Sequence, residues 1–338
     1  MNISFNSKIS EIKNKKIILF GASSCAELFV KCFPDIDILC FVDNDSQKWG
    51  KKFLGFKVYN PSIIEKIEFD FAIVISSSYI LEINDQLKHT KYYGKVYSAL
   101  HLITNRDFSK QIIHESINEI DMVRDLLNDE QSKKVFDYCL CSRLAGNNDY
   151  RDIYSPNQYF IDEIKLHQNE VFVDCGAYIG DTIDSYISHV GRFEKIYAFE
   201  MDNKNYNKMV HKYSNTGNIY MYNVGIWSEK KKLYFENSGN SSQIGEGSQL
   251  CNVNSLDNLI EERITYVKMD IEGAEYNALL GAKRIIQKYH PKLAVCIYHK
   301  ETDLWKIPLL VHNILPEYKL IIRHHEIYSC ETVLYAYV

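Results

Sequence analysis

The chain has 338 residues, enough for two domains, and its 46% hydrophobic and 25% charged content is ordinary for a globular protein. A net charge of −5 gives no general attraction to nucleic acid or to anionic membranes, so we expect neither as a partner. The sequence contains no apolar run of transmembrane length and no signal peptide at its N-terminus, so we expect a cytoplasmic protein.

The first alternating α/β pattern covers residues 15–100. Apolar runs predict strands, and helical spacing between them predicts helices. The expected strands are 16–21, 37–42, 71–76 and 95–100, and the expected helices are 24–33 and 79–89. This order is typical of a small parallel sheet, so we predict a Rossmann-like domain over residues 1–107.

Two residues of this domain stand where a nucleotide would bind. Gly21 ends the first strand, and Asp43 ends the second about twenty residues later, where a Rossmann-type unit contacts a ribose. A single glycine does not make the dinucleotide fingerprint, which argues against bound NAD. The domain resembles the N-terminal domains of bacterial sugar-modifying enzymes, in which Gly21 and Asp43 would line a nucleotide-sugar pocket. The alternative is a domain that serves homodimerisation or docking.

Residues 108–153 differ from what precedes them. Apolar residues recur at helical spacing from Ile112 to Leu127 and again from Val135 to Leu140, with charged residues between them. We predict a helical connector between two domains.

A second α/β alternation starts with a strand at 171–175. Gly176 and Gly180 follow it, and a helix is expected from Asp181 to His189. Glycines let backbone approach a ligand, a helix start presents free N–H groups, and Asp174 offers a carboxylate at the strand end. This pattern indicates a ligand-binding loop, although its G-x-x-x-G spacing departs from the dinucleotide fingerprint.

The remaining elements continue the alternation to the C-terminus. Strands are expected at 195–200, 219–223, 264–270, 292–298, 318–323 and 332–337, with helices at 202–213, 256–260 and 304–315 and a long helix opened by 271–275. A hairpin is expected at 231–235 with a loop over 237–248. No helix separates the last two strands, so we predict an antiparallel hairpin at the sheet edge.

Glu200 ends the second strand of this half, about twenty-five residues after Asp174. A carboxylate at that position can accept both hydroxyls of a ribose. The alternative is that Glu200 caps the following helix. The glycine loop and Asp174 favour ribose binding.

Taken together, residues 155–338 resemble a class I S-adenosylmethionine-dependent methyltransferase of the FkbM family. The matching blocks are Val173–Thr182, Ala198–Glu200, Asn223–Gly225, Ser255–Leu259 and, most specifically, Lys268–Glu275. Two positions depart from the family pattern. Met201 stands where proline is usual, and Tyr178 stands where asparagine is frequent.

The resemblance implies an α/β methyltransferase domain over 154–338, with a seven-stranded Rossmann-like sheet whose last strand is antiparallel. It also implies S-adenosylmethionine along the carboxyl ends of the strands. The implied cofactor-binding residues are Asp174, Gly176, Tyr178, Gly180 and Thr182 for the methionine portion, Glu200 for the ribose, Asn223 for the adenine, and Asp270.

Three further side chains follow the ends of two neighbouring strands. Asp270 and Glu272 follow one, and His299 follows the next. A hydroxyl acceptor needs a base or a metal, so His299 is a candidate general base with Asp270 beside it. Alternatively, Asp270, Glu272 and His299 bind Mg²⁺ or Mn²⁺, or all three have structural roles.

We therefore expect an O-methyltransferase that acts on a sugar hydroxyl. The family resemblance points to a nucleotide-activated sugar in the biosynthesis of a bacterial surface (capsular) polysaccharide. Two alternatives stay open: a nucleotide-sugar-binding or dehydrogenase-like protein with a degenerate methyltransferase domain, or a methyltransferase for a non-sugar metabolite.

Overall fold

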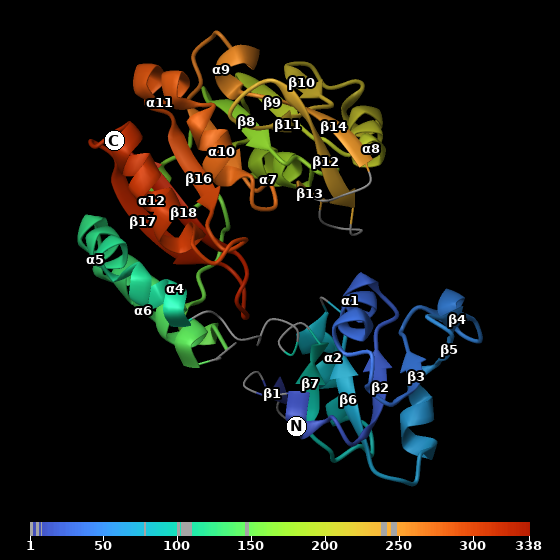
Figure 1. Ribbon diagram of the computed structural model, residues 1–338. Coiled ribbons are helices and arrows are strands. Elements are labelled where there is room, and N and C mark those ends of the chain that lie inside the picture. The colour runs from blue at the N-terminus through green and yellow to red at the C-terminus, as the bar shows by residue number, and fades with distance from the viewer. Residues whose placement is uncertain are drawn as a thin grey trace. The chain divides into compact units, whose positions relative to one another are not determined.

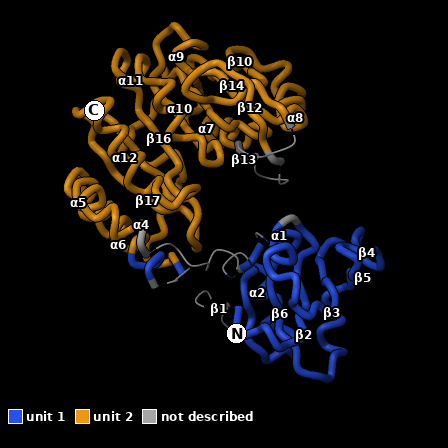
Figure 2. The backbone as a smooth tube through the Cα atoms, in the orientation of Figure 1, with its two compact units in different colours: residues 1–108, 141–149 blue, residues 109–140, 150–338 orange. Residues whose placement is uncertain are grey.

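Two seven-stranded sheets organise the chain, each in a unit of its own (Figure 1, Figure 2). The computed structural model describes residues 3–4, 7, 9–77, 79–99, 102, 110–145, 149–237, 242–244 and 249–338. Residues 1–108 with 141–149 form unit 1, and residues 109–140 with 150–338 form unit 2. The domain boundaries at 107 and 153 remain predictions, and the first lies outside the described residues.

Unit 1 is built on a mostly parallel sheet in the order β1-β7-β6-β2-β3-β5-β4. Its strands are β1 (Ile3–Ser4), β2 (Lys16–Phe20), β3 (Ile38–Val42), β4 (Lys52–Phe53), β5 (Phe56–Tyr59), β6 (Phe71–Ile75) and β7 (Val96–Ser98). Its helices are α1 (Ser24–Cys32) and α2 (Ile80–Lys88). The four predicted strands are present, because each is an unbroken apolar run that the sheet buries. The short antiparallel pair β4–β5 was not predicted.

Unit 2 contains the sheet β10-β9-β8-β15-β16-β18-β17. The parallel strands are β8 (Val171–Cys175), β9 (Lys195–Phe199), β10 (Ile219–Tyr222), β15 (Tyr266–Met269) and β16 (Lys292–Cys296). The last strand, β18 (Thr332–Tyr337), runs antiparallel between β16 and the edge strand β17 (Lys319–His324). The predicted class I methyltransferase fold is confirmed, including the antiparallel hairpin at the sheet edge.

Helices cover both faces of this sheet. Helices α7 (Asp181–Val190) and α8 (Asn203–Tyr213) bury Tyr186 and Met209 against the strand residues Phe172 and Ile196. The other helices are α9 (Leu256–Leu259), α10 (Glu275–Leu280), α11 (Lys283–Tyr289) and α12 (Asp303–Ile314). Val173 and Val267 face the other side of the sheet and are also buried.

The long helix expected from residue 271 is two short helices, α10 and α11, and the prediction was wrong there. The first begins only at Glu275, because Glu272 and Gly273 adopt positive φ values of 55° and 90°. The break between them falls at Gly281, where an added side chain would overlap the Trp227 carbonyl. Residues 270–274 therefore form a loop at the end of β15.

A small second sheet lies beside the main one in the order β11-β14-β12-β13. Its strands are β11 (Gly225–Ile226), β12 (Lys231–Asn237), β13 (Ser242–Ile244) and β14 (Gln249–Asn254). The predicted hairpin is therefore larger than expected. Residues 238–241 and 245–248 of the predicted loop lie outside the described residues.

The predicted connector contains α4 (Lys110–Glu115), α5 (Ile117–Leu126) and α6 (Glu130–Ala145). Residues 109–140 belong to unit 2, where α5 packs on α12 and Leu127 bridges to Leu320 of β17. The buried guanidinium of Arg323 donates to Asp129 at 3.0 Å and to Glu163 at 2.5 Å. Among the helices that the structure describes, none has both the length and the apolar character needed to cross a membrane.

Candidate active site

The loop after β8 brings three strand ends together. Gly176 and Gly180 have φ values of 82° and 86°, in the region that favours glycine. A side chain on Gly176 would overlap the carbonyl oxygen of Asp270, and one on Gly180 would overlap the Tyr213 ring. The two glycines therefore allow close packing between parts of unit 2. Gly176 also lines a cavity, and Gly180 is not among its lining residues.

A buried ion pair supports this loop. The Lys268 ammonium lies 3.0 Å from the Asp174 carboxylate and donates to the Gly176 carbonyl at 2.9 Å. Burial raises the pKa of Asp174 to about 6, although Lys268 opposes the shift. Asp174 is fully buried and does not line the cavity. It thus positions the loop, and its expected contact with the methionine portion is not supported.

Glu200 ties the same loop to the end of β9. Its carboxylate accepts hydrogen bonds from the backbone N–H of Tyr178 at 2.8 Å and of Asp202 at 2.7 Å. Burial raises the pKa of Glu200 to about 7. The Asn223 amide donates to the carbonyls of Glu200 and Met201 at 2.9 and 3.2 Å. Asn223 therefore holds the turn after β9 and lines neither of the two cavities described next.

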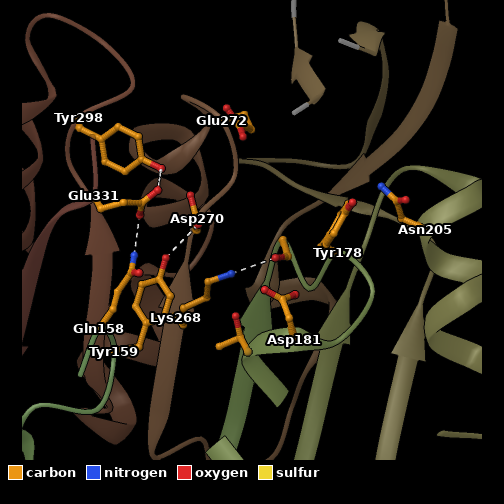
Figure 3. A pocket seen from close by; sticks show the side chains of 12 residues that line it. Gln158, Tyr159, Tyr178, Asp181, Asn205, Lys268, Asp270, Glu272, Tyr298 and Glu331 are labelled. Carbon is orange, nitrogen blue, oxygen red and sulfur yellow. Dashed lines mark hydrogen bonds between the residues drawn. The ribbon is translucent and has the colours of Figure 1, made fainter. Parts of the chain in front are cut away.

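A polar cavity of about 330 Å³ lies at the carboxyl ends of the parallel strands (Figure 3). At one end, which we call the loop end, it is lined by Tyr178, Asp181, Thr182 and Asn205. At the other, which we call the carboxylate end, it is lined by Gln158, Tyr159, Asp270, Tyr298 and Glu331. Lys268 lies between the two groups in Figure 3.

A second cavity of about 60 Å³ adjoins the first, because both are lined by Gly176, Asp270 and Glu272. Its other walls are mostly apolar and come from Phe199, Met201, Gly225, Ile226, Ile271 and Ala274. The polar cavity therefore adjoins a smaller, mostly apolar cavity, which we call the apolar slot.

At the carboxylate end two acids face each other. Asp270 accepts a hydrogen bond from the Tyr159 hydroxyl at 2.9 Å. Glu331 accepts from the Gln158 amide at 2.5 Å and from the Tyr298 hydroxyl at 3.0 Å. Burial, and then the charge of Asp270, raise the pKa of Glu331 to about 7. Burial also acts to raise the pKa of Asp270, but Lys268 and the other neighbours outweigh it and hold that pKa below its usual range.

His299 lies behind Asp270, outside the residues that line the cavity. Its Nδ1 is 3.0 Å from Glu275, and its Nε2 is 3.5 Å from Asp270 and 3.6 Å from Glu272. Burial lowers the pKa of this imidazole, but the three carboxylates outweigh burial and raise it to about 9. A ring with a pKa raised in this way gives up its proton less readily and is a poorer base at neutral pH, and the general-base role of His299 stays a prediction.

The predicted metal set is also rearranged. Donor atoms of Asp270, Glu275 and His299 lie within 4.8 Å of one another, so Glu275, and not Glu272, completes the closest group with His299. A divalent ion there would have to displace the imidazole proton, because a protonated ring has no lone pair to donate. The cluster is already balanced as a histidinium among carboxylates, and metal binding stays a prediction.

In unit 1, Gly21 and Asp43 are both engaged within the domain. Asp43 accepts from the Ala22 N–H at 2.9 Å, the Asp45 N–H at 2.8 Å and the Lys48 ammonium at 2.9 Å. Gly21 has a φ of 114°, and a side chain there would lie 2.6 Å from the Ser76 carbonyl oxygen. A nucleotide sugar would have to compete with these contacts, so neither residue supports the predicted pocket.

Seven residues that line the cavity were not predicted: Gln158, Tyr159, Asp181, Asn205, Lys268, Tyr298 and Glu331. Asp181 and Lys268 stand inside the two most informative sequence blocks and could have been found there. Glu331 carries no sequence signal, because its position depends on how the last strand enters the sheet.

Comparison with known proteins adds the family. The model described as Methyltransferase FkbM domain matches residues 174–324, and the one described as C2185-like, N-terminal matches residues 13–95. No curated protein matches the chain.

Among solved structures, the methyltransferase FkbM from Methylobacillus flagellatus KT is 21% identical, with a TM-score of 0.71 over 99% of this chain and 94% of that one. An rRNA methylase from Streptococcus thermophilus is 18% identical, with a TM-score of 0.34 over 51% of this chain and 88% of that one. The first likeness shows that the fold is shared along nearly the whole chain. Residues 174–324 are thus the part of the chain that matches the FkbM methyltransferase family model, and the structural likeness shows the shared fold.

Proposed function

We propose that this protein transfers the methyl group of S-adenosylmethionine to a hydroxyl oxygen of a sugar. The observation that carries the proposal is the pair of adjoining cavities, one polar and one apolar, at the carboxyl ends of the strands of an FkbM methyltransferase domain. Open α/β sheets bind their ligands at this edge.

The residues at the site fit the methyl donor. The apolar slot between Phe199, Met201 and Ile226 suits the adenine ring. Glu200 lines neither cavity, but it stands between Phe199 and Met201, which line the apolar slot, and its carboxylate accepts two backbone N–H groups and still has lone pairs for ribose hydroxyls. At the loop end, Asp181 and Asn205 can bind the amino-acid portion. When bound, S-adenosylmethionine supplies an electrophilic methyl group on a sulfonium cation, which the surrounding carboxylates would stabilise.

The carboxylate end suits an acceptor rich in hydroxyl groups. It offers amide and phenol groups from Gln158 and Tyr298 beside the acceptor oxygens of Asp270 and Glu331. Such mixed hydrogen-bonding groups match the alternating donors and acceptors of a sugar. This match, together with the family resemblance, supports a sugar over a small apolar alcohol.

The charge of the cavity limits where a nucleotide would lie. Asp181, Asp270, Glu272 and Glu331 line it, while the ammonium of Lys268 is paired with Asp174. Phosphate groups would be repelled from such a chamber. If the sugar is nucleotide-activated, its diphosphate must therefore lie outside the cavity, and a sugar within a surface polysaccharide would fit equally well.

The test is to incubate the full chain with S-adenosylmethionine and a panel of acceptors, and to measure S-adenosylhomocysteine. The panel contains UDP- and GDP-linked sugars, methyl glycosides, polysaccharide fragments and matched non-sugar alcohols, amines and thiols. Turnover with sugars is expected, and turnover confined to the non-sugar compounds would contradict the substrate class. Turnover lost with EDTA and restored by Mg²⁺ or Mn²⁺ would establish the predicted metal.

Calorimetry separates the competing function. A dehydrogenase-like protein would bind NAD tightly and S-adenosylmethionine not at all. We expect the reverse, because the Asp43 carboxylate is already engaged by Lys48 and two backbone N–H groups.

A further inference from the structure

The topology of unit 2 places one unpredicted acid, Glu331, in the cavity. Glu331 is the residue before β18, the strand that runs antiparallel to its neighbour β16. An antiparallel strand begins at the edge where parallel strands end. The start of β18 therefore meets the ends of β15 and β16, next to Asp270 and Tyr298 (Figure 3). Resting on the proposed function, we propose that the Glu331 carboxylate takes the proton of the acceptor hydroxyl while the acceptor oxygen is methylated.

Two hydrogen bonds fix the orientation of this carboxylate. The Gln158 amide holds one oxygen at 2.5 Å, and the Tyr298 hydroxyl holds the other at 3.0 Å. The side chain is half-buried and still lines the cavity. Each carboxylate oxygen has a second lone pair, so both can accept a further hydrogen bond. An acceptor hydroxyl at this end of the cavity would find a preorganised base.

The surroundings of Glu331 suit proton uptake near neutral pH. The titratable groups around it are Lys268 and Asp270 from β15 and the loop after it, Cys296, Tyr298 and His299 from β16 and the loop after it, and Tyr159. Cys330 precedes it in the chain. Burial, and then the Asp270 charge, raise the pKa of Glu331, but the proposed role rests on position: the carboxylate lines the cavity and is oriented by Gln158 and Tyr298.

The other candidates fit the role less well. Lys268 and the other neighbours hold the pKa of Asp270 below its usual range, which makes it a weaker base. His299 is protonated and lies outside the cavity lining. Asp181 lines the opposite, loop end. Glu331 lies at the carboxylate end, and each of its two carboxylate oxygens is held by a hydrogen bond.

The step balances as follows. The acceptor oxygen forms a bond to the methyl carbon and gives its proton to a Glu331 oxygen. The bond between that carbon and sulfur breaks, and its electron pair stays on the sulfur, which becomes a neutral thioether. The protonated Glu331 then returns its proton to water. Nothing is oxidised or reduced.

The experiment compares wild type with Glu331→Gln, Glu331→Asp and the control Glu326→Gln. Glu326 lies on the same β17–β18 connection, its carboxylate accepts from the Ile327 N–H at 3.2 Å, and it is not one of the residues that line the cavity. The kinetic probe is the panel sugar with the highest wild-type rate, measured from pH 5 to 9. We expect E331Q to lower kcat by about 10²–10⁴-fold and to lose the rise in rate towards pH 7. E331D should keep that rise, and E326Q should stay within about twofold of wild type.

Two measurements do not depend on turnover. Calorimetry with S-adenosylhomocysteine should give E331Q a Kd within about twofold of wild type, which separates proton transfer from cofactor binding. Between pH 6 and 8, the infrared spectrum of the ligand-free wild type should lose the band of one protonated carboxyl group. The spectrum of E331Q should not show this loss. Other acids, including Glu200, titrate in this range and cancel in the difference.

The outcomes separate the two proposals. If wild type methylates a sugar and E331Q keeps both its rate within about tenfold and its rise towards pH 7, Glu331 is not the base. If E331Q fails to fold, Glu331→Ala replaces it, because it also lacks the carboxylate, and a rate within about tenfold of wild type with the same rise towards pH 7 would overturn the role. If wild type gives no S-adenosylhomocysteine with any acceptor, the proposed function fails and this inference fails with it.

Discussion

The turn after β2 in unit 1 and the turn after β8 in unit 2 share one hydrogen-bond pattern. In each, an acid at the end of the next strand accepts a backbone N–H from the turn and another from two residues further along. Asp43 accepts from Ala22 and Asp45, and Glu200 accepts from Tyr178 and Asp202. Even the backbone carbonyls match, since Trp49 donates to that of Asp43 and Asn223 to that of Glu200.

The two turns differ in what surrounds the acid. The Lys48 ammonium lies 2.9 Å from the Asp43 carboxylate and neutralises its charge. Glu200 is desolvated enough for burial to raise its pKa to about 7, and its neighbours Phe199 and Met201 line the apolar slot. A strand-end acid is thus first a structural residue that joins two loops. Its capacity to bind a ligand depends on whether its charge is already neutralised.

The largest effect is expected from the glycines of the two turns. Gly176→Ala would place a Cβ atom that overlaps the Asp270 carbonyl oxygen, at a residue whose φ is positive. Gly21→Ala would place a Cβ atom 2.6 Å from the Ser76 carbonyl oxygen. We expect G176A to cost unit 2 about 3 kcal/mol or more and to abolish S-adenosylmethionine binding. G21A should cost unit 1 about 2 kcal/mol and leave that binding unchanged.

Hydrogen–deuterium exchange can read the two units separately, which a single unfolding curve cannot do for a chain of two units. Wild-type protection of β8 and β15 in G176A would contradict the packing argument.

The next effect concerns the acids themselves. Glu200→Gln keeps the shape but removes the charge that would hold ribose hydroxyls, so we expect the Kd for S-adenosylmethionine to rise about 10–100-fold. Asp43→Asn is the matched change in unit 1 and should leave that Kd within about twofold. It should instead lower the stability of unit 1 by about 1–3 kcal/mol, because an amide cannot accept from Lys48 and both backbone N–H groups as the carboxylate does. Calorimetry measures the Kd of both variants. Equal effects of the two substitutions on this Kd would contradict the proposed difference between Glu200 and Asp43.

A smaller effect is expected in the pH dependence of stability. The folded state raises the pKa of Glu200 from 4.5 to about 7, so it holds this proton more tightly than the unfolded chain does. Its contribution to the free energy of unfolding is complete below pH about 4.5 and is lost as the pH rises through about 7. Glu200→Gln removes this term. Between pH 5 and 8, wild-type unit 2 should therefore lose on the order of 1–3 kcal/mol more stability than E200Q does. Hydrogen–deuterium exchange of unit 2 amides at both pH values, corrected for intrinsic exchange rates, checks this, and parallel losses in the two proteins would refute it.

The smallest effect is expected from the side chains that hold the acid's carbonyl. Asn223→Ala removes the bonds to the Glu200 and Met201 carbonyls and should cost about 1 kcal/mol. The Kd for S-adenosylmethionine should then rise about threefold to fivefold. Trp49→Phe removes the matching bond in unit 1 and should leave the Kd unchanged. A larger loss for N223A than for E200Q would mean that Asn223 binds the adenine directly, as the sequence suggested.

The sheets were predictable because their strands are long apolar runs that end in glycine or an acid. Burial on both faces leaves such runs few alternatives. The loop 270–274 was not predictable, because its backbone depends on Gly273 and on a left-handed Glu272, whereas its composition favours a helix start. The long helix failed for the same reason.

The site was predictable only in part. Of the predicted positions, Gly176, Tyr178, Thr182, Asp270 and Glu272 line the cavity. The roles of the others depend on partners that are distant in sequence. Asp174 is neutralised by Lys268, which stands 94 positions later in the chain. The pKa of His299 is raised by the carboxylates of Glu275 and Asp270, which come from another part of the chain. Glu331 enters the cavity through the inserted antiparallel strand. Periodicity cannot reveal such pairings, because they arise from strand order.

The buried Arg323 has a consequence for dissecting the protein. Its guanidinium is held by Asp129 and Ser132 from the helical segment and by Glu163 from the stretch before β8. A chain trimmed to begin at residue 154 would keep every motif of the methyltransferase family. It would nevertheless leave this buried cation with one of its two carboxylates and would uncover the face of α12 that α5 packs against. A fragment that keeps these contacts must therefore include unit 2 from residue 109, well upstream of the first residue that the family match includes.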